Sequence, residues 1–233
     1  MSGSALQLRM QERLSEKLLR GHLQLRTAST FHVEESDPLN DGAADVELVL
    51  SAEHECLLYA PESVPDARSA TKPDTTPKSR SDTTCFQFLR NQRLADGTLL
   101  VPTVEGRVAA HIVECKKTLN PRKWSQVKEQ FAGTLYRLRA LSQVLELQID
   151  QVICYTACRD NHMVRTSPAN TVHRRAYTGL SADPGTSEGS DHAQHVADLG
   201  PPFGRIRHVD ILLRIEQLDG QEVGCGRLEL PAA

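Results

Sequence analysis

Residues 109–117 read Ala109-Ala-His-Ile-Val-Glu-Cys-Lys-Lys117, an apolar run that ends in a carboxylate and two ammonium groups. Successive side chains of a strand point to opposite faces, so Glu114 and Lys116 share one face with Ile112. An acid and a lysine at the end of a buried strand are costly to desolvate. A divalent metal on Glu114 and a phosphate near Lys116 would offset that cost, so the pair indicates a site.

The flanking sequence places this strand inside a sheet. Residues 98–104 form an apolar run before it, and Glu105-Gly106 between the two runs fits a two-residue hairpin turn. After it, Asn120-Pro121 is typical of a helix start, and apolar residues then recur at helical spacing over about 120–147. Another apolar strand follows at 151–157. Strand, helix and strand in this order predict a crossover unit with two parallel strands in one sheet.

This order of hairpin, Glu-x-Lys, amphipathic helix and returning strand resembles the core of the PD-(D/E)xK nuclease superfamily, over about residues 84–158. The resemblance implies an α/β fold with a mixed central sheet, flanking helices and the restriction-endonuclease-like αβββαβ core. In that family an upstream aspartate and the (D/E)xK pair bind one or two magnesium ions, and the lysine helps the attacking water. It therefore implies Glu114 as a catalytic metal ligand, Lys116 as the catalytic lysine, and Mg²⁺ or Mn²⁺ as the cofactor. Some members carry a glutamine and a tyrosine on the following helix, where Gln130 and Tyr136 lie at a spacing that does not match well.

The upstream aspartate has three candidates, ranked Asp96, Asp82 and Asp66. If Glu105-Gly106 is the turn, Glu114 lies opposite Gly97, and Asp96 is its diagonal neighbour. Asp82 and Asp66 need a longer path to the site, although Asp66 follows a proline and so matches the family motif literally. The other interpretation of Asp96 is a hairpin turn between a strand at 85–94 and the strand at 98–104. The sequence leaves both roles of Asp96, metal ligand and turn residue, open.

Composition predicts one domain, residues 1–233, in the cytoplasm or another intracellular compartment. A net charge of −3, from 27 basic and 30 acidic residues, requires any nucleic-acid-binding surface to be local. No run approaches the roughly 18 apolar residues of a membrane span, and no secretory signal is visible. The six cysteines form no CxxC pair, which favours free thiols. Cys154, Cys158 and His162 have only a loosely zinc-like spacing.

The rest of the chain predicts elements around this core. Residues 4–26 fit one amphipathic helix, and 33–45 are acidic and turn-rich between it and short strands at 46–50 and 56–59. Residues 60–83 and 160–204 are polar loops, and residues 60–83 and 181–200 are expected to be the most mobile parts. Residues 205–230 fit a hairpin that turns at Asp219-Gly220. His192 and His195, in the second loop, are interpreted as incidental polar residues.

Two functions from different classes follow. A nuclease needs a metal to activate water and a local basic surface to bind phosphates; Lys117, Arg122, Lys123 and Lys128 come directly after the Glu-x-Lys pair, and DNA is the favoured substrate over RNA. The alternative is a nuclease-like fold without catalysis, acting as a scaffold or a nucleic-acid-binding subunit. The sequence leaves a monomer, a homodimer and a larger assembly open. A carboxylate of Asp96, Asp82 or Asp66 within about 5 Å of Glu114 would favour the nuclease.

Overall fold

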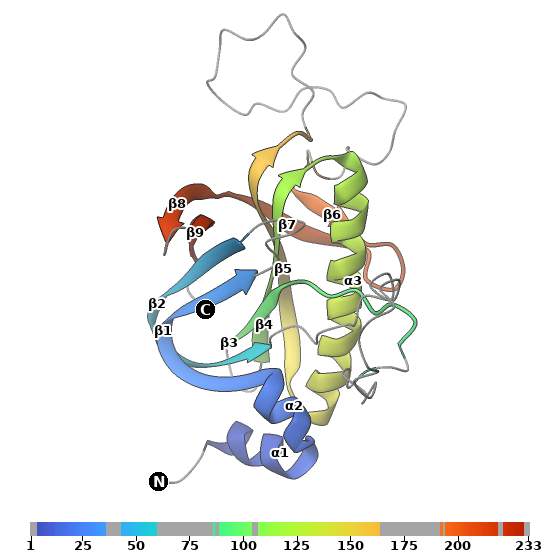
Figure 1. Cartoon of the computed structure of the whole chain (residues 1–233). Helices are drawn as coiled ribbons and strands as arrows, with labels where there is room; N and C mark the ends of the chain where they lie inside the picture. Colours follow the sequence, from blue (N-terminus) through green and yellow to red (C-terminus); the bar gives the residue numbers. More distant parts are fainter. Residues whose placement is uncertain are drawn as a thin grey trace, which may run out of the picture.

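The computed structural model describes residues 4–35, 43–59, 86, 89–103, 107–163, 192, 194–218 and 221–230. Within these residues one mixed sheet has the order β6-β7-β5-β4-β3-β2-β9-β8, and β1 pairs with β2 off this path. The long helix α3 runs along one face of the sheet, and α1 and α2 lie at its lower end in Figure 1. The bounds of the elements are α1 Ala5–Arg13, α2 Glu16–Gly21, β1 Leu23–Glu35, β2 Ala43–Tyr59, β3 Gly97–Pro102, β4 Arg107–Leu119, α3 Pro121–Val144, β5 Gln148–Asn161, β6 Val196–Asp198, β7 Arg205–Leu212, β8 Arg214–Leu218 and β9 Gln221–Glu229.

The predicted crossover unit is confirmed. Strand β4 pairs antiparallel with β3 and parallel with β5, and α3 connects the two parallel strands. The Asn120 side chain accepts a hydrogen bond from the Lys123 amide at 3.0 Å, and Pro121 is the first residue of the helix. This local chemistry starts α3 where the sequence predicts, because the N-cap satisfies an amide that the helix leaves unpaired.

The register of the β3–β4 hairpin differs by one residue from the prediction. Val113, rather than Glu114, lies opposite Gly97. The Thr103 amide donates to the Arg107 carbonyl at 3.0 Å, so three residues connect the strands instead of the two expected. The predicted turn at Glu105-Gly106 itself lies outside the described residues. Loop length fixes hairpin register, which explains the shift.

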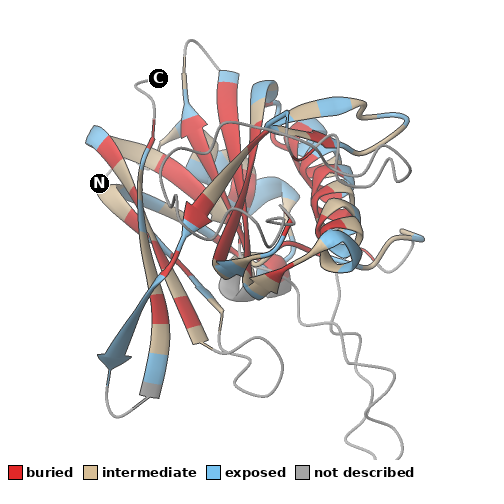
Figure 2. Ribbon diagram, turned by 90° about the horizontal axis from the view of Figure 1, so that it is seen from above, coloured by how far each residue is buried: buried red, intermediate tan, exposed pale blue. Residues whose placement is uncertain are grey.

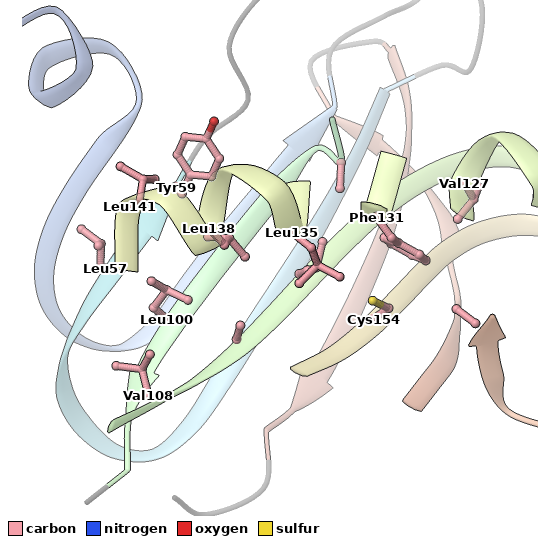
Figure 3. Close-up of a cluster of buried hydrophobic side chains, with 14 of the residues drawn as sticks. Leu57, Tyr59, Leu100, Val108, Val127, Phe131, Leu135, Leu138, Leu141 and Cys154 are labelled. Atoms are coloured by element: carbon pink, nitrogen blue, oxygen red, sulfur yellow. The ribbon is translucent and has the colours of Figure 1, made fainter. Parts of the chain in front are cut away.

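Helix α3 covers the sheet with one apolar stripe, and this stripe forms the larger core. Figure 3 shows its side chains pointing onto β3, β4 and β5, and Figure 2 shows buried residues along the side of α3 that faces the sheet. Burying each large apolar side chain contributes roughly 1.5–3 kcal/mol. The whole predicted stripe is buried, which confirms it: Trp124, Val127, Phe131, Leu135, Leu138, Leu141 and Leu145.

The opposite face of the sheet forms a second core because the sheet curls over itself. Strands β7 and β8 are consecutive in the chain yet belong to opposite ends of the strand order, so the sheet bends to bring these ends together. Gly226 permits this closure, since a Cβ there would lie 2.7 Å from the Leu213 side chain. The buried residues inside the curl include Phe31, Leu48 and Tyr155.

The predicted C-terminal hairpin 205–230 is only partly right. Strand β8 pairs with β9, but β7 leaves that hairpin and pairs parallel with β5. The apolar alternation of residues 205–215 continues through the junction at Leu213, so the sequence pattern does not mark the change of partner.

Predictions for the N-terminal region and two connections are also corrected. The helix expected over 4–26 is two short helices, because Ser15 caps α2, and β1 begins at Leu23. Strands β1 and β2 take up the two ends of the turn-rich stretch expected at 33–45, while residues 36–42 lie outside the described residues. In the strand expected over 85–94, the described residues 86 and 89–94 have no strand pairing. The 160–204 loop contains the end of β5 and strand β6, while the 60–83 loop lies outside the described residues.

His111 predicts a pH-dependent stability of the fold. It is buried inside the curl with Nδ1 2.9 Å from the Tyr155 hydroxyl, and burial lowers the pKa of His111 to about 4 from 6.5. Between pH 6.5 and about 4, His111 is therefore protonated in the unfolded chain but neutral in the folded chain. The free energy of unfolding falls as the pH falls through this range. This loss amounts to roughly 3 kcal/mol.

Urea unfolding at several pH values checks this expectation. The stability difference between wild type and His111→Gln should shrink as the pH falls through this window, whereas exposed His162→Gln should leave the pH dependence unchanged. A His111→Gln difference that is constant from pH 7 to pH 4 would contradict it.

Candidate active site

Glu114 and Lys116 lie together on the α3 side of β4, as their alternation predicts. Glu114 is 0% exposed, and the Lys116 ammonium, whose side chain is 11% exposed, contacts Glu114 Oε1. Burial raises the pKa of Glu114 to about 7, against the opposing effects of Lys116 and the Gln130 side chain. The carboxylate is thus held in surroundings that disfavour its charge.

Asp96 joins this pair from the end of the segment that leads into β3. Its Oδ2 accepts a hydrogen bond from the Cys115 amide at 2.6 Å, which anchors the carboxylate beside Glu114. Burial, the nearby Glu114 charge and a hydrogen bond with Glu35 raise the pKa of Asp96, against the effect of Lys116. The interpretation of Asp96 as a turn between two strands is wrong, because residues 89–95 before it form no strand.

Glu35, at the end of β1, is the site residue that the sequence interpretation missed. Gly97 lets β1 approach closely, since a Cβ there would lie 2.7 Å from both methyl groups of Val33. Two residues further along the same strand, Glu35 shares a hydrogen bond with the Asp96 carboxyl group. The sequence feature that could have placed Glu35 in a strand is the alternation of Phe31, Val33 and Glu35, which puts all three side chains on one face.

Gln130 brings α3 into the site. Its Nε2 donates to the Leu94 carbonyl at 3.1 Å, and its side chain lowers the pKa of Glu114. The glutamine suggested by the family resemblance therefore lies beside Glu114. Tyr136, the other suggested residue, packs edge-on against Phe203 with ring centroids 4.7 Å apart.

The predicted basic surface is present in part. Lys117 and Arg122 are exposed where β4 ends and α3 begins, and Lys123 is half-buried. The Lys128 ammonium lies 5.8 Å from the centre of the Trp124 ring. Arg137, further along α3, is not part of this surface, because it is fully buried and donates to the backbone carbonyls of residues 91 and 133. The candidates Asp82 and Asp66 lie outside the described residues.

The donor set fits a hard divalent cation. Within the described part of the chain, neither buried oxygen of Glu114 accepts a well-directed hydrogen bond, although Lys116 contacts one of them. Mg²⁺ prefers oxygen ligands and commonly uses one or two carboxylates while keeping several waters. Asp96 and Glu114 supply two such carboxylates, with Glu35 behind Asp96.

No protein-family model matches this chain, and no curated protein or solved structure matches it either. Among the described helices, none combines the length and the apolar character that a membrane span requires.

Two substitutions of Asp96 separate its possible roles as structural acceptor and metal ligand. Asp96→Asn keeps an oxygen for the Cys115 amide but loses the charge, so we expect a fold close to wild type and at least about tenfold weaker Mn²⁺ binding. Asp96→Ala also removes the acceptor and should cost a further 1–2 kcal/mol or so of unfolding free energy.

Calorimetric titration with Mn²⁺ and urea unfolding measure the two effects. The matched control is Asp150→Asn. Asp150 is an exposed residue of β5 whose carboxylate accepts a hydrogen bond from the Thr103 hydroxyl. Unchanged Mn²⁺ affinity in Asp96→Asn would mean that Asp96 serves the fold alone.

Proposed function

We propose that this chain is a metal-dependent nuclease with a restriction-endonuclease-like core, acting on DNA. The observation that carries the proposal is the fully buried Glu114 carboxylate beside Lys116, with the Asp96 carboxylate held by the neighbouring Cys115 amide. A buried ion pair is weak support for stability, because desolvating both charges can exceed their attraction. A divalent cation between the carboxylates and a phosphate near the ammonium would balance these charges.

The strand order supports the fold part of the proposal. Strands β2, β3 and β4 are successive antiparallel neighbours, and α3 then leads to β5, parallel to β4. With the N-terminal helices before them, these elements follow the αβββαβ order of the family. The long strand β1, which stands between α2 and β2, departs from that order.

Each residue of the site has a role in this proposal. Asp96 and Glu114 would hold the ion, which when bound stabilises phosphate charge and lowers the pKa of a bound water. The Lys116 ammonium stabilises the negative charge that develops on the attacked phosphate. Gln130, tied to the Leu94 carbonyl, positions the Glu114 side chain.

The substrate backbone would be bound by the basic residues that follow Lys116. Lys117 and Arg122 are exposed, and Lys123 lies in the first turn of α3, whose amides also attract anions. These charges lie close to the site in the chain, which compensates locally for the net charge of −3.

A catalytically inactive binding subunit is the second candidate, and the Lys116–Glu114 contact favours it. In that case the ammonium itself neutralises the buried carboxylate, and the pair serves as a fixed structural contact.

A cleavage assay distinguishes the two functions. Tag-free protein is incubated with supercoiled plasmid, linear duplex DNA, single-stranded DNA and RNA, each with Mg²⁺, with Mn²⁺ and with EDTA. We expect cleavage of DNA that EDTA abolishes and excess metal restores. Intact substrates under every metal condition, together with retained DNA binding, would favour the inactive subunit.

A further inference from the structure

A second cluster of side chains that can bind a metal ion lies beside the proposed active site, on the same face of the sheet. His208 and Asp210 come from β7, and His192 from the short described stretch before β6. One ligand atom from each of these three residues lies within 4.8 Å of the other two. Both imidazole rings are buried, and the Asp210 side chain is 29% exposed.

The two imidazoles converge on a single oxygen of the Asp210 carboxylate. Asp210 Oδ1 lies 3.1 Å from His192 Nε2 and 3.8 Å from His208 Nε2. Two ligand atoms on one tetrahedral zinc ion, with bonds of about 2.0–2.1 Å, lie roughly 3.4 Å apart. The observed separations bracket this value, so only small side-chain movements are needed to place an ion between the three atoms.

Neighbouring groups fix the orientation of these side chains. The Asn161 amide donates to the other Asp210 oxygen, Oδ2, at 3.3 Å. Trp124 of α3 packs against both imidazoles, with ring centroids 4.9 Å from His192 and 4.6 Å from His208. Outer contacts of this kind orient metal ligands and raise their affinity.

We propose that His192, His208 and Asp210 form a zinc site. Two imidazoles and one carboxylate suit zinc better than magnesium, since Mg²⁺ selects oxygen ligands. Three protein ligands leave one position open for a water or a substrate oxygen, as in catalytic rather than structural zinc sites.

The zinc site is distinct from the Glu114 centre. In the sheet register Glu114 pairs with Thr156, and Thr156 pairs with Asp210, so one strand separates the two acidic residues. Adjacent strands are about 4.8 Å apart, which places the two backbones roughly 10 Å from each other. The two carboxylates also have different partners: Asp210 contacts His192, His208 and Asn161, whereas Glu114 contacts Lys116. The zinc proposal therefore does not depend on the nuclease proposal.

Thr156 shows what changes when zinc binds. Its Oγ1 lies 2.9 Å from His208 Nε2, within hydrogen-bond distance. Zinc needs the lone pair of that nitrogen, so the Thr156 hydroxyl must give up this contact and bond elsewhere.

The test is zinc titration of tag-free protein stripped with EDTA, followed with a competing chromogenic chelator. We expect one zinc ion per chain, with an apparent Kd below about 1 µM. His192→Ala and Asp210→Asn should each weaken binding by at least about tenfold to hundredfold, because the loss of an outer-shell partner already costs this much and these residues are direct ligands. His192 is 6% exposed and the Asp210 side chain 29% exposed, against 1% for His208, and thermal unfolding of each variant checks that it folds.

His162→Ala is the matched control, because it removes a histidine of the alternative Cys154, Cys158 and His162 set. That variant should bind zinc as wild type does, and so should Glu114→Gln, which separates this site from the proposed nuclease centre. The proposal would be overturned if the wild-type protein did not bind zinc with a submicromolar Kd. Binding that survives in both His192→Ala and Asp210→Asn, or that is lost in His162→Ala, would overturn it as well.

Discussion

Glu114→Gln is expected to lower the rate of metal-dependent DNA cleavage by at least about 10³-fold. The substitution keeps the size of a side chain that is fully buried, but it removes the negative charge that would hold the cation. The pKa of Glu114 is raised to about 7 by burial, so the carboxylate gains most from a cation at neutral pH and above. Initial rates on plasmid DNA at saturating Mn²⁺ give the measurement.

Glu129→Gln is the matched control for this substitution. Glu129 is an exposed carboxylate on α3, one residue from Gln130, and pairs with Arg93. Its loss should leave cleavage within about threefold of wild type, as for most surface substitutions. Cleavage by Glu114→Gln at the wild-type rate would remove Glu114 from the catalytic centre.

Lys116→Met is expected to lower kcat by about 10²- to 10³-fold while Mn²⁺ binding stays equal or becomes tighter. The ammonium stabilises charge on the phosphate but does not bind a cation. It also contacts Glu114 Oε1, so it would compete with a binding cation for that oxygen. Single-turnover cleavage and calorimetric Mn²⁺ titration separate the two effects.

The neighbouring Lys117 gives a direct comparison on the same strand. Lys117→Met removes an equal charge from an exposed side chain, so KM should rise while kcat is largely retained. A kcat loss of equal size in both variants would mean that Lys116 acts through general electrostatics rather than at the reacting phosphate.

The central part of the fold could be predicted because its signals are local. Asn120 and Pro121 specify where α3 begins, and the stripe from Trp124 onwards specifies which side packs on the sheet. The pairing of Glu114 and Lys116 followed from strand alternation alone. These features need only neighbouring residues, and the structure confirms them.

The remaining features depend on contacts between distant segments. Glu35 reaches the site because β1 packs against Gly97, more than sixty residues later in the chain, as the numbering shows. The helical spacing of leucines in residues 4–26 continues past Gly21. The sequence pattern therefore predicted that the helix extends into the residues that begin β1. His192 was interpreted as incidental because its partners, His208 and Asp210, come from a strand outside its own loop.

The most direct test of the proposed catalytic centre is a crystal of the protein soaked in Mn²⁺ and measured for anomalous scattering. The account predicts an anomalous peak bonded to the carboxylate oxygens of Glu114 and Asp96, with Gln130 still tied to the Leu94 carbonyl. A saturating soak that leaves no peak there, with the Lys116 ammonium still against Glu114 Oε1, would contradict it.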